Sequence, residues 1–341
     1  MIGEGGEAVE YRGRGAAEFD LPSVLAQLDG QDPSEQLAAV RRIRSVIEEH
    51  ERPAACVPTV PKLRSLLERT DVDFHEEIAT CLAELAVEAP SDVAPSTGTI
   101  AAVAVERADQ PVARELLRCL AAVAAERPAV VGDHTAAIVS VLEQRRGYDR
   151  HGLRILAHVS RRRPEEIVQA VSVLTEALKT NPTENGRPVL RAFSRLARSG
   201  TTVPSLEFVE HAVDLVDHDE TPLRYDAIGC LGDVAAQDPA AVESVCDDLA
   251  VALSCADPDT RATAAVTLAR VAAERQTAIN PVRSQLLGLL TDDHAHVRAN
   301  ACAALGHGRV DAAATRLASL EREDPSAIVR DRAGWALEQL S

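Results

Sequence analysis

The chain has 341 residues and a formal net charge of −17, and aromatic residues make up only 2% of it. No stretch approaches the roughly 18 consecutive apolar residues of a membrane-spanning helix, and the opening letters MIGEGGEAVEYRGRG lack the apolar core of a signal peptide. We therefore expect a cytoplasmic protein that does not enter a membrane. Glycine and charged residues predict a flexible tail over residues 1–18, and residues 19–341 are expected to form a single folded unit.

Proline recurs at a regular interval along the chain. Phrases that end in Pro53, Pro90, Pro128 and Pro164 are 37, 38 and 36 residues apart, and AQDP follows 75 residues later, at Pro239. Proline cannot continue the helix before it, but it can begin the next one. Each phrase therefore marks a boundary between two helices.

These boundaries and the spacing of apolar residues predict nine pairs of helices. The first helices are expected near residues 21–28, 54–69, 93–107, 131–145, 165–179, 204–216, 240–254, 278–290 and 310–321. The second helices are expected near residues 34–49, 74–88, 111–126, 149–162, 187–198, 222–236, 259–274, 295–306 and 326–340. No pair can bury its apolar stripe alone, so neighbouring pairs must stack into a helical solenoid.

One motif, Arg-x-x-Ala-x-x-x-Leu, occurs four times in the last third of the chain. Its arginines, Arg224, Arg261, Arg298 and Arg330, are 37, 37 and 32 residues apart, and each copy follows a polar, acidic break. Alanine and leucine at these spacings lie on one helical face, while Asp or Ser in the break can cap the helix. The motif therefore repeats one structural unit.

With this period and motif the chain resembles HEAT-repeat proteins of the armadillo type. The D-x-x-x-x-V-R-x-x-A segments at Asp292–Ala301 and Asp324–Ala333 resemble the short HEAT repeats named after phycobilisome lyases. The resemblance implies an all-α fold, a right-handed α-α superhelix of about nine helix pairs. It also implies a structural ladder of loop aspartates and helix arginines between repeats, at Asp292, Asp324, Arg224, Arg261, Arg298 and Arg330.

The basic residues are almost all arginine, with 34 Arg against two Lys. An acidic surface nearly free of lysine is typical of extreme halophiles, in which carboxylates hold water and cations at molar salt, and it suggests a haloarchaeal protein. A GC-rich genome that favours Arg, Ala and Asp codons would give the same bias. In both cases we expect much of the acidity to serve solvation rather than binding.

Positive charge is nevertheless concentrated in one window. Residues 144–200 hold twelve basic and five acidic residues, a local net charge of +7. On one predicted helix the arginines follow at i, i+4, i+8 and i+11, which is a single face, and the second helices of the two preceding repeats carry similar pairs. The candidate partner-binding residues are Arg114, Arg118, Arg150, Arg154, Arg161, Arg187, Arg191, Arg195 and Arg198.

The second helix of each pair usually lines the concave surface of HEAT proteins, so the resemblance implies an arginine strip inside repeats 3–5. Guanidinium groups suit bidentate contact with carboxylate or phosphate. These features predict a non-enzymatic scaffold or adaptor that binds another protein with an acidic surface. The same arginines could instead pair with acids of adjacent repeats, or cover apolar surface with their stems.

Nucleic acid is an alternative ligand, because some HEAT-like DNA glycosylases grip a duplex in a basic groove. Those proteins combine an extended positive surface with aromatic residues, whereas the arginine window offers only Tyr148 and Phe193. Molar salt would also weaken contacts made to phosphate alone. Both points favour a protein partner.

A lyase-type or metal-dependent HEAT enzyme is the second alternative. Phosphate-binding glycine loops, GxSxG and HExxH are missing from the sequence, so we predict no catalytic residues, no cofactor and no metal. HEAT proteins that hydroxylate deoxyhypusine carry His-Glu dyads on their inner helices, where this chain has pairs such as Arg114-Glu115. Asp292, His294 and His296 are interpreted as capping and solvent-facing residues of a turn.

The seven cysteines form no CxxC pair and stand mostly among apolar letters. We interpret them as small buried side chains in a reducing cytoplasm. Trp335, the single tryptophan, is expected to belong to the core of the last helix pair.

Overall fold

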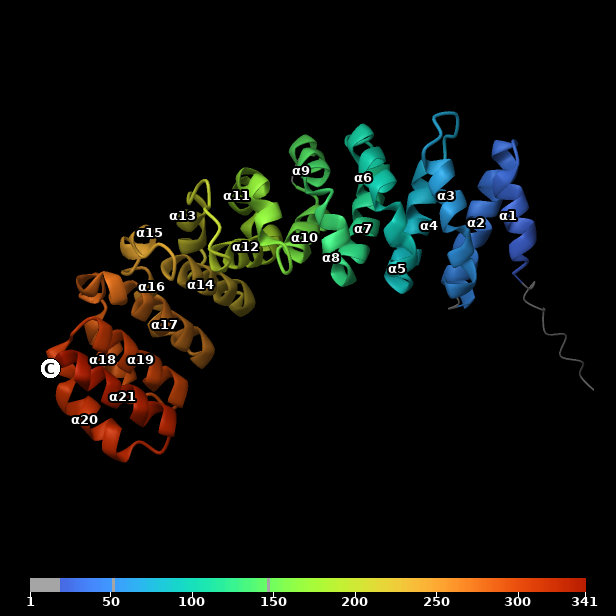
Figure 1. Ribbon diagram of the computed structural model, residues 1–341. Coiled ribbons are helices and arrows are strands. Elements are labelled where there is room, and N and C mark those ends of the chain that lie inside the picture. The colour runs from blue at the N-terminus through green and yellow to red at the C-terminus, as the bar shows by residue number, and fades with distance from the viewer. Residues whose placement is uncertain (1–18, 51–52, 146–147) are drawn as a thin grey trace, which may run out of the picture.

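The computed structural model describes residues 19–50, 53–145 and 148–341. The tail expected at residues 1–18 lies outside the described residues. Within those ranges the chain is all-α, with nine successive helix pairs and no strand, which confirms the predicted solenoid. Figure 1 shows the pairs stacked one beside the next along an arc, with α1 at one end and α21 at the other.

The first helix of each pair is short and is often divided into two or three segments. The label η marks a 3-10 helix. The first-helix segments are α1 (Leu21–Asp29), η1 (Pro53–Thr59), α3 (Val60–Leu67), α5 (Pro90–Val93), η2 (Ala94–Ser96), α6 (Thr97–Glu106), α8 (Pro128–Gly132), α9 (Thr135–Gln144), η3 (Pro164–Ala170), α11 (Val171–Thr180), α13 (Phe208–Val213), α15 (Ala240–Glu243), α16 (Leu249–Leu253), η4 (Gln276–Ile279), α18 (Arg283–Leu289), η5 (Asp311–Ala313) and α20 (Ala314–Glu323).

The second helices are continuous. They are α2 (Pro33–His50), α4 (His75–Glu88), α7 (Pro111–Glu126), α10 (Arg150–Val159), α12 (Pro182–Arg198), α14 (Thr221–Ala235), α17 (Pro258–Glu274), α19 (Ala295–His307) and α21 (Ala327–Leu340).

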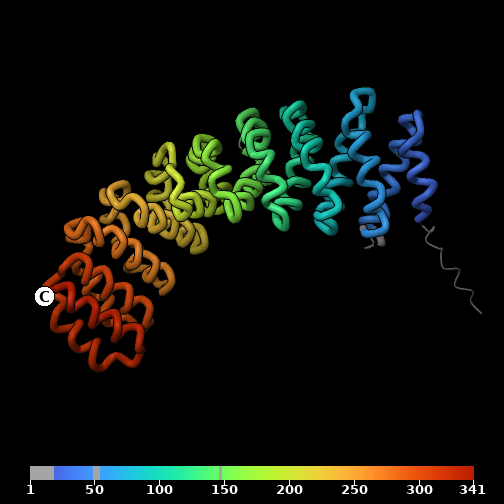
Figure 2. The backbone as a smooth tube through the Cα atoms, in the orientation of Figure 1, coloured from blue at the N-terminus to red at the C-terminus, as the bar shows by residue number. Residues whose placement is uncertain are grey.

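The second helices line the concave side of the arc. In Figure 1, α12, α14 and α17 lie along the inner edge, and α7 and α10 lie on the inner side of α6 and α9, whereas α6, α9, α11 and α13 lie along the outer edge. Each of these second helices packs against the second helix of the pair before it and of the pair after it. Figure 2 shows that the arc bends toward this inner side over its C-terminal half. The solvent-facing sides of the second helices therefore form one continuous concave surface.

A single hydrophobic cluster runs through the stack from Val24 to Ala336. Most of its members are Ala, Val and Leu, so neighbouring helices approach closely. At Gly306 of α19, an added Cβ atom would lie 2.9 Å from the Cα atom of Ala336 in α21. Because each pair buries its apolar side against its neighbours, the pairs stabilise one another.

Prolines and caps set the helix boundaries, and several boundaries differ from those expected, of which two show the reason clearly. Helix α12 begins at Pro182 rather than near residue 187, because Asn181 caps it by accepting a hydrogen bond from the backbone N–H of Glu184 at 3.3 Å. The helix expected at 54–69 is divided into η1 and α3. Pro58 lies inside η1 and has no N–H to donate within a continuous α-helix.

The cysteines and the tryptophan serve packing. All seven cysteines are free, and only Cys255 is not fully buried. Burial raises the pKa of the Cys119 thiol to about 12, so this thiol stays protonated at neutral pH. Trp335 is half-buried against the core, with its ring edge toward His307. None of the helices in the described ranges is both long enough and apolar enough to cross a membrane.

Candidate binding groove

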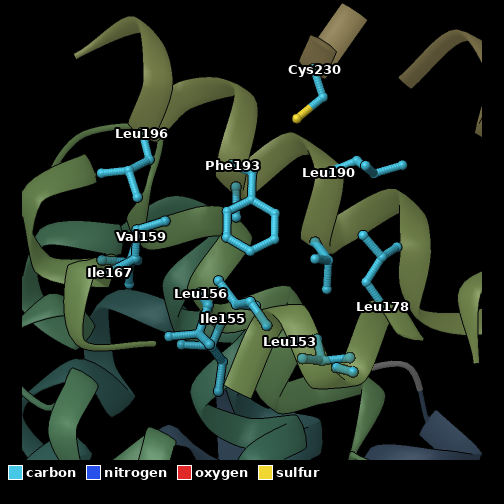
Figure 3. Close-up of a cluster of buried hydrophobic side chains, with 14 of the residues drawn as sticks. Leu153, Ile155, Leu156, Val159, Ile167, Leu178, Leu190, Phe193, Leu196 and Cys230 are labelled. Atoms are coloured by element: carbon cyan, nitrogen blue, oxygen red, sulfur yellow. The ribbon is translucent and has the colours of Figure 1, made fainter. Parts of the chain in front are cut away.

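Helices α10 and α12 each carry an apolar side and an arginine side. Leu153 and Leu156 of α10 and Leu190 and Phe193 of α12 are fully buried. Figure 3 shows these side chains gathered in the cluster that joins the two helices. The arginines lie on the other sides of the helices, because an interval of four residues keeps side chains on one face. The fold therefore directs the two arginine rows toward the concave surface.

The two arginine rows enclose a groove of about 640 Å³. The lining includes one acidic side chain, Glu184, and six arginines, which are Arg150, Arg154, Arg161, Arg187, Arg191 and Arg195. The groove is thus strongly positive although the chain as a whole carries −17. It can bind an anion through several guanidinium groups at once.

The arginines of this groove that come from α10 and the turn after it have no partners in the described part of the chain. Arg150, Arg154 and Arg161 are exposed, and none of them forms a hydrogen bond or an ion pair with another described residue. Intramolecular pairing, the alternative raised by the sequence, therefore does not account for these three.

The arginines of α12 are partly neutralised by the next repeat. Arg187 and Arg191 share one carboxylate, that of Asp226 in α14, at 3.2 and 3.1 Å. Arg198 lies 3.3 Å from Asp233, also in α14. Because two guanidinium groups share a single carboxylate at Asp226, one positive charge remains uncompensated there. Pairing with an adjacent repeat therefore holds for these three arginines.

Positive groups crowd the floor of the groove. Arg195 donates hydrogen bonds to the backbone carbonyl of Ala157 and, at 3.2 Å, to Ser160 Oγ, both on the α10 side. Burial, followed by the charges of Arg161, Arg191 and Arg198, lowers the pKa of Arg195. An anion in the groove would relieve this repulsion.

His158 of α10 lines the same groove and is affected in the same way. Burial, and then the charges of Arg161, Arg154 and Arg195, lower the pKa of His158 below its ordinary value. The histidine is therefore kept neutral near pH 7, and the positive charge of the groove comes from arginine alone.

The two candidate residues of α7 do not line this groove. Arg118 pairs with Glu115 at 2.7 Å and lies 4.0 Å from Glu84. Arg114 is exposed and makes no hydrogen bond or ion pair within the described part of the chain. The structure thus brings together Arg150, Arg154, Arg161, Arg187, Arg191 and Arg195 in one groove and leaves the α7 arginines one helix away.

A second hollow of about 390 Å³ adjoins the groove over α12, α14 and α17. The two hollows share Arg191 and Arg195. The candidate residue Arg198 also lines this second hollow. Other members were not singled out from the sequence, among them Tyr225, Asp226 and Asp233 of α14 and Arg270 of α17. The signal that could have found the aspartates is an acidic residue about one repeat length after each arginine of α12.

The helix arginines of the C-terminal repeats make a separate set of contacts with loop aspartates. Nε and Nη2 of Arg261 donate to the two carboxylate oxygens of Asp292, at 2.8 and 3.0 Å. Arg298 binds Asp324 in the same way, at 2.8 and 2.9 Å. Arg330 has no aspartate of a following repeat, and its Nη1 donates to the backbone carbonyl of Asp324 at 2.7 Å. Each aspartate lies in the loop before the next second helix, so these pairs join successive repeats.

Arg224 does not make the corresponding carboxylate contact. Its Nη1 donates to the backbone carbonyl of His218, in the loop before α14, at 2.7 Å. Arg261 and Arg298 make the same contact with the loop that precedes their own helix. Cys255 occupies the position, six residues before Arg261, that Asp292 occupies before Arg298. Nε of Arg224 is buried and finds no hydrogen-bond partner within the described ranges. The set of pairs is therefore interrupted between the sixth and seventh repeats.

The histidines of the turn before α19, His294 and His296, each lie near an aspartate. Both carboxylate oxygens of Asp292 accept from Arg261, and Nδ1 of His294 lies 3.3 Å from one of them. His296 points instead toward Asp259, at 3.9 Å. In the described part of the chain, no group of three or more His, Cys, Asp or Glu side chains is placed to hold a metal ion.

The comparison with protein families agrees with the fold. Residues 246–338 match the family described as HEAT repeats. No curated protein matches the chain. Among solved structures, the chain is similar to an engineered protein determined by the Northeast Structural Genomics Consortium. The two share 22% identity and a TM-score of 0.45, over 73% of this chain and 96% of that one.

Proposed function

We propose that this HEAT-repeat solenoid is a non-enzymatic scaffold that binds an acidic segment of another protein in the groove between α10 and α12. HEAT repeats commonly mediate protein interactions. The observation that carries the proposal is the row of arginines at Arg150, Arg154 and Arg161, which have no partner among the described residues of a chain with 53 acidic residues. Acids that could have neutralised this row are plentiful in the sequence, yet among the described residues Glu184 alone lines the groove.

The energetics of the groove support an anionic ligand. Like charges at i and i+4, such as Arg150 and Arg154, destabilise a helix by a few tenths of a kcal/mol for each pair. None of the described residues pairs with Arg150 or Arg154 to offset this repulsion. A carboxylate-rich ligand would do so, because each guanidinium can give two parallel hydrogen bonds to a carboxylate.

A peptide fits the groove better than a nucleic acid does. Single strands are usually held by aromatic side chains on which the bases stack. The lining of the groove contains no Phe, Tyr or Trp.

We further propose that residues 19–341 act as one unit in the cytoplasm, a reading supported by the continuous hydrophobic cluster from Val24 to Ala336. The excess of 53 acidic over 36 basic residues would then keep the chain solvated at high salt.

The test is the affinity of a fluorescein-labelled, glutamate-rich peptide, measured by fluorescence anisotropy at the lowest salt that preserves the helical circular dichroism. The groove variant carries Arg150→Glu, Arg154→Glu and Arg161→Glu. The matched control carries Arg127→Glu, Arg283→Glu and Arg322→Glu, three exposed arginines outside the groove. Both variants change the net charge by the same amount.

We expect the groove variant to lose at least about tenfold in affinity, because three direct contacts with the ligand are reversed in charge. The control should lose far less, through long-range repulsion alone. Equal losses in the two variants would show that net charge, and not the groove, governs binding. Tighter binding of a single-stranded oligonucleotide of equal charge would favour the nucleic-acid alternative instead.

A further inference from the structure

We infer that the acidic segment is bound in an extended conformation and continues from the groove into the adjoining hollow over α14 and α17. This inference rests on the proposed function and adds the length and course of the ligand. Its basis is that the two hollows share Arg191 and Arg195, which form the wall between them. An occupant of the groove therefore meets the second hollow without leaving the concave surface.

The second hollow has an open position that leaves room for a peptide chain. Gly229 of α14 belongs to its lining, and an added Cβ atom there would meet no other atom within 4 Å, so we call this open position the floor of the hollow. Tyr225, one turn earlier on the same helix, is 45% exposed and lines the hollow. Glycine in the middle of a helix is unfavourable relative to alanine, and no packing contact requires it here. The open floor is what the glycine provides.

The charges of the hollow favour the same kind of ligand as the groove. Arg198 and Arg270 both pair with Asp233, at 3.3 and 3.2 Å, and Ser194 also donates to this carboxylate. With the shared Arg191 and Arg195, the hollow holds four arginines against Asp226 and Asp233. It is therefore positive, but less so than the groove, and Tyr225 adds an aromatic surface.

The distance to be spanned sets the length of the segment. From α10 to α17 the surface crosses three steps between neighbouring second helices, and packed helices lie about 8–10 Å apart, so the course is about 27 Å long. An extended chain advances about 3.3–3.6 Å for each residue, so about eight or nine residues cover this course. A compact polyanion would fill the groove alone.

The experiment compares two labelled oligo-glutamate peptides, of about four and about nine residues, against variants of Gly229. Gly229→Leu fills the floor of the second hollow without changing the charge. Gly229→Ala adds only a Cβ atom and serves as the control. Both substitutions replace glycine in a helix where the added Cβ has free space, so the fold should be retained, and circular dichroism checks this.

We expect the longer peptide to bind the wild type at least about tenfold more tightly than the shorter one, through the added contacts of the second hollow. Gly229→Leu should remove most of that advantage and leave the affinity of the short peptide unchanged. If the long peptide binds Gly229→Leu and the wild type equally well, the inferred course is wrong. The proposed function then still stands on the effect of the Arg150, Arg154 and Arg161 substitutions. If neither peptide binds the wild type, the proposed function fails, and the inference fails with it.

Discussion

Arg298 in α19 donates two parallel hydrogen bonds to the carboxylate of Asp324, in the loop before α21, from Nε at 2.8 Å and from Nη2 at 2.9 Å. The two side chains are only 11% and 2% exposed. Removal of the carboxylate would leave the buried guanidinium without its counter-charge. We therefore expect Asp324→Ala to lower the free energy of unfolding by about 3 kcal/mol.

Urea denaturation followed by circular dichroism measures this loss. Asp331→Ala serves as the control, because Asp331 lies in the neighbouring helix and is exposed. A loss no larger for Asp324 than for Asp331 would mean that the pair does not hold the last two repeats together.

The same pair predicts a dependence of stability on pH. Hydrogen bonds from Arg298, and then from the backbone N–H of Ser326, hold the pKa of Asp324 below its ordinary value in spite of burial. In the unfolded chain the carboxyl group titrates near pH 4. The stabilisation is therefore complete above that pH, and it is lost as the pH falls through the lower pKa of the folded state.

Comparison with Asp324→Asn isolates this contribution from those of other carboxylates. The difference in unfolding free energy between wild type and variant should be constant from pH 7 to about pH 5 and should shrink below about pH 4. A difference that stays constant down to pH 3 would rule out the assigned titration.

Cys255 stands where the series of arginine–aspartate pairs is interrupted, and this predicts a stabilising substitution. Cys255→Asp would place a carboxylate where Asp292 stands one repeat later, within reach of the unpartnered Nε of Arg224. A charge-assisted hydrogen bond of this kind contributes about 1.5–3 kcal/mol. The midpoint of thermal unfolding should rise for Cys255→Asp and should not rise for Cys255→Asn, which has the same shape without the charge.

Asp226 competes with the proposed ligand for Arg187 and Arg191. Asp226→Asn should free both guanidinium groups and raise the affinity for the glutamate-rich peptide about threefold to tenfold. Asp219→Asn makes the same change in net charge at an exposed position outside the groove, and it should have little effect. Weaker peptide binding by a folded Asp226→Asn variant would indicate that Asp226 positions the arginines rather than competing for them.

The acidic composition predicts dependence of the fold on salt. If the excess of acidic residues is an adaptation to molar salt, their mutual repulsion is screened only at high ionic strength. Helical circular dichroism should then collapse on dialysis into dilute buffer and return when salt is restored. A cooperative thermal transition in dilute buffer would contradict the halophilic interpretation.

The sequence was sufficient to predict the nine helix pairs, because prolines such as Pro128 and Pro164 stand at helix starts, and the period of about 37 residues is carried by the packing itself. It was insufficient for the groove. Whether an arginine is paired depends on which acid of the next helix lies opposite it. Asp226 faces Arg187 and Arg191 only because of the rotation and offset between α12 and α14.

The second hollow lay beyond sequence reasoning for a related reason. It needs the side chains of three helices to converge, and its floor is defined by the missing side chain of Gly229. A glycine in a helical pattern does not show by itself whether the added volume of alanine would clash. Gly306 and Gly229 both lie within helices, yet only at Gly306 would a Cβ atom meet its neighbours.

The most direct test of the proposed scaffold is to locate the bound peptide. A glutamate-rich peptide of about nine residues would carry a photoreactive benzoylphenylalanine, and the cross-linked residues would be identified by mass spectrometry after digestion. The account predicts cross-links confined to α10, α12, α14 and α17, which disappear when Arg150, Arg154 and Arg161 are changed to Glu. Cross-links concentrated on the outer helices, such as α9 and α11, or unchanged in that variant, would contradict it.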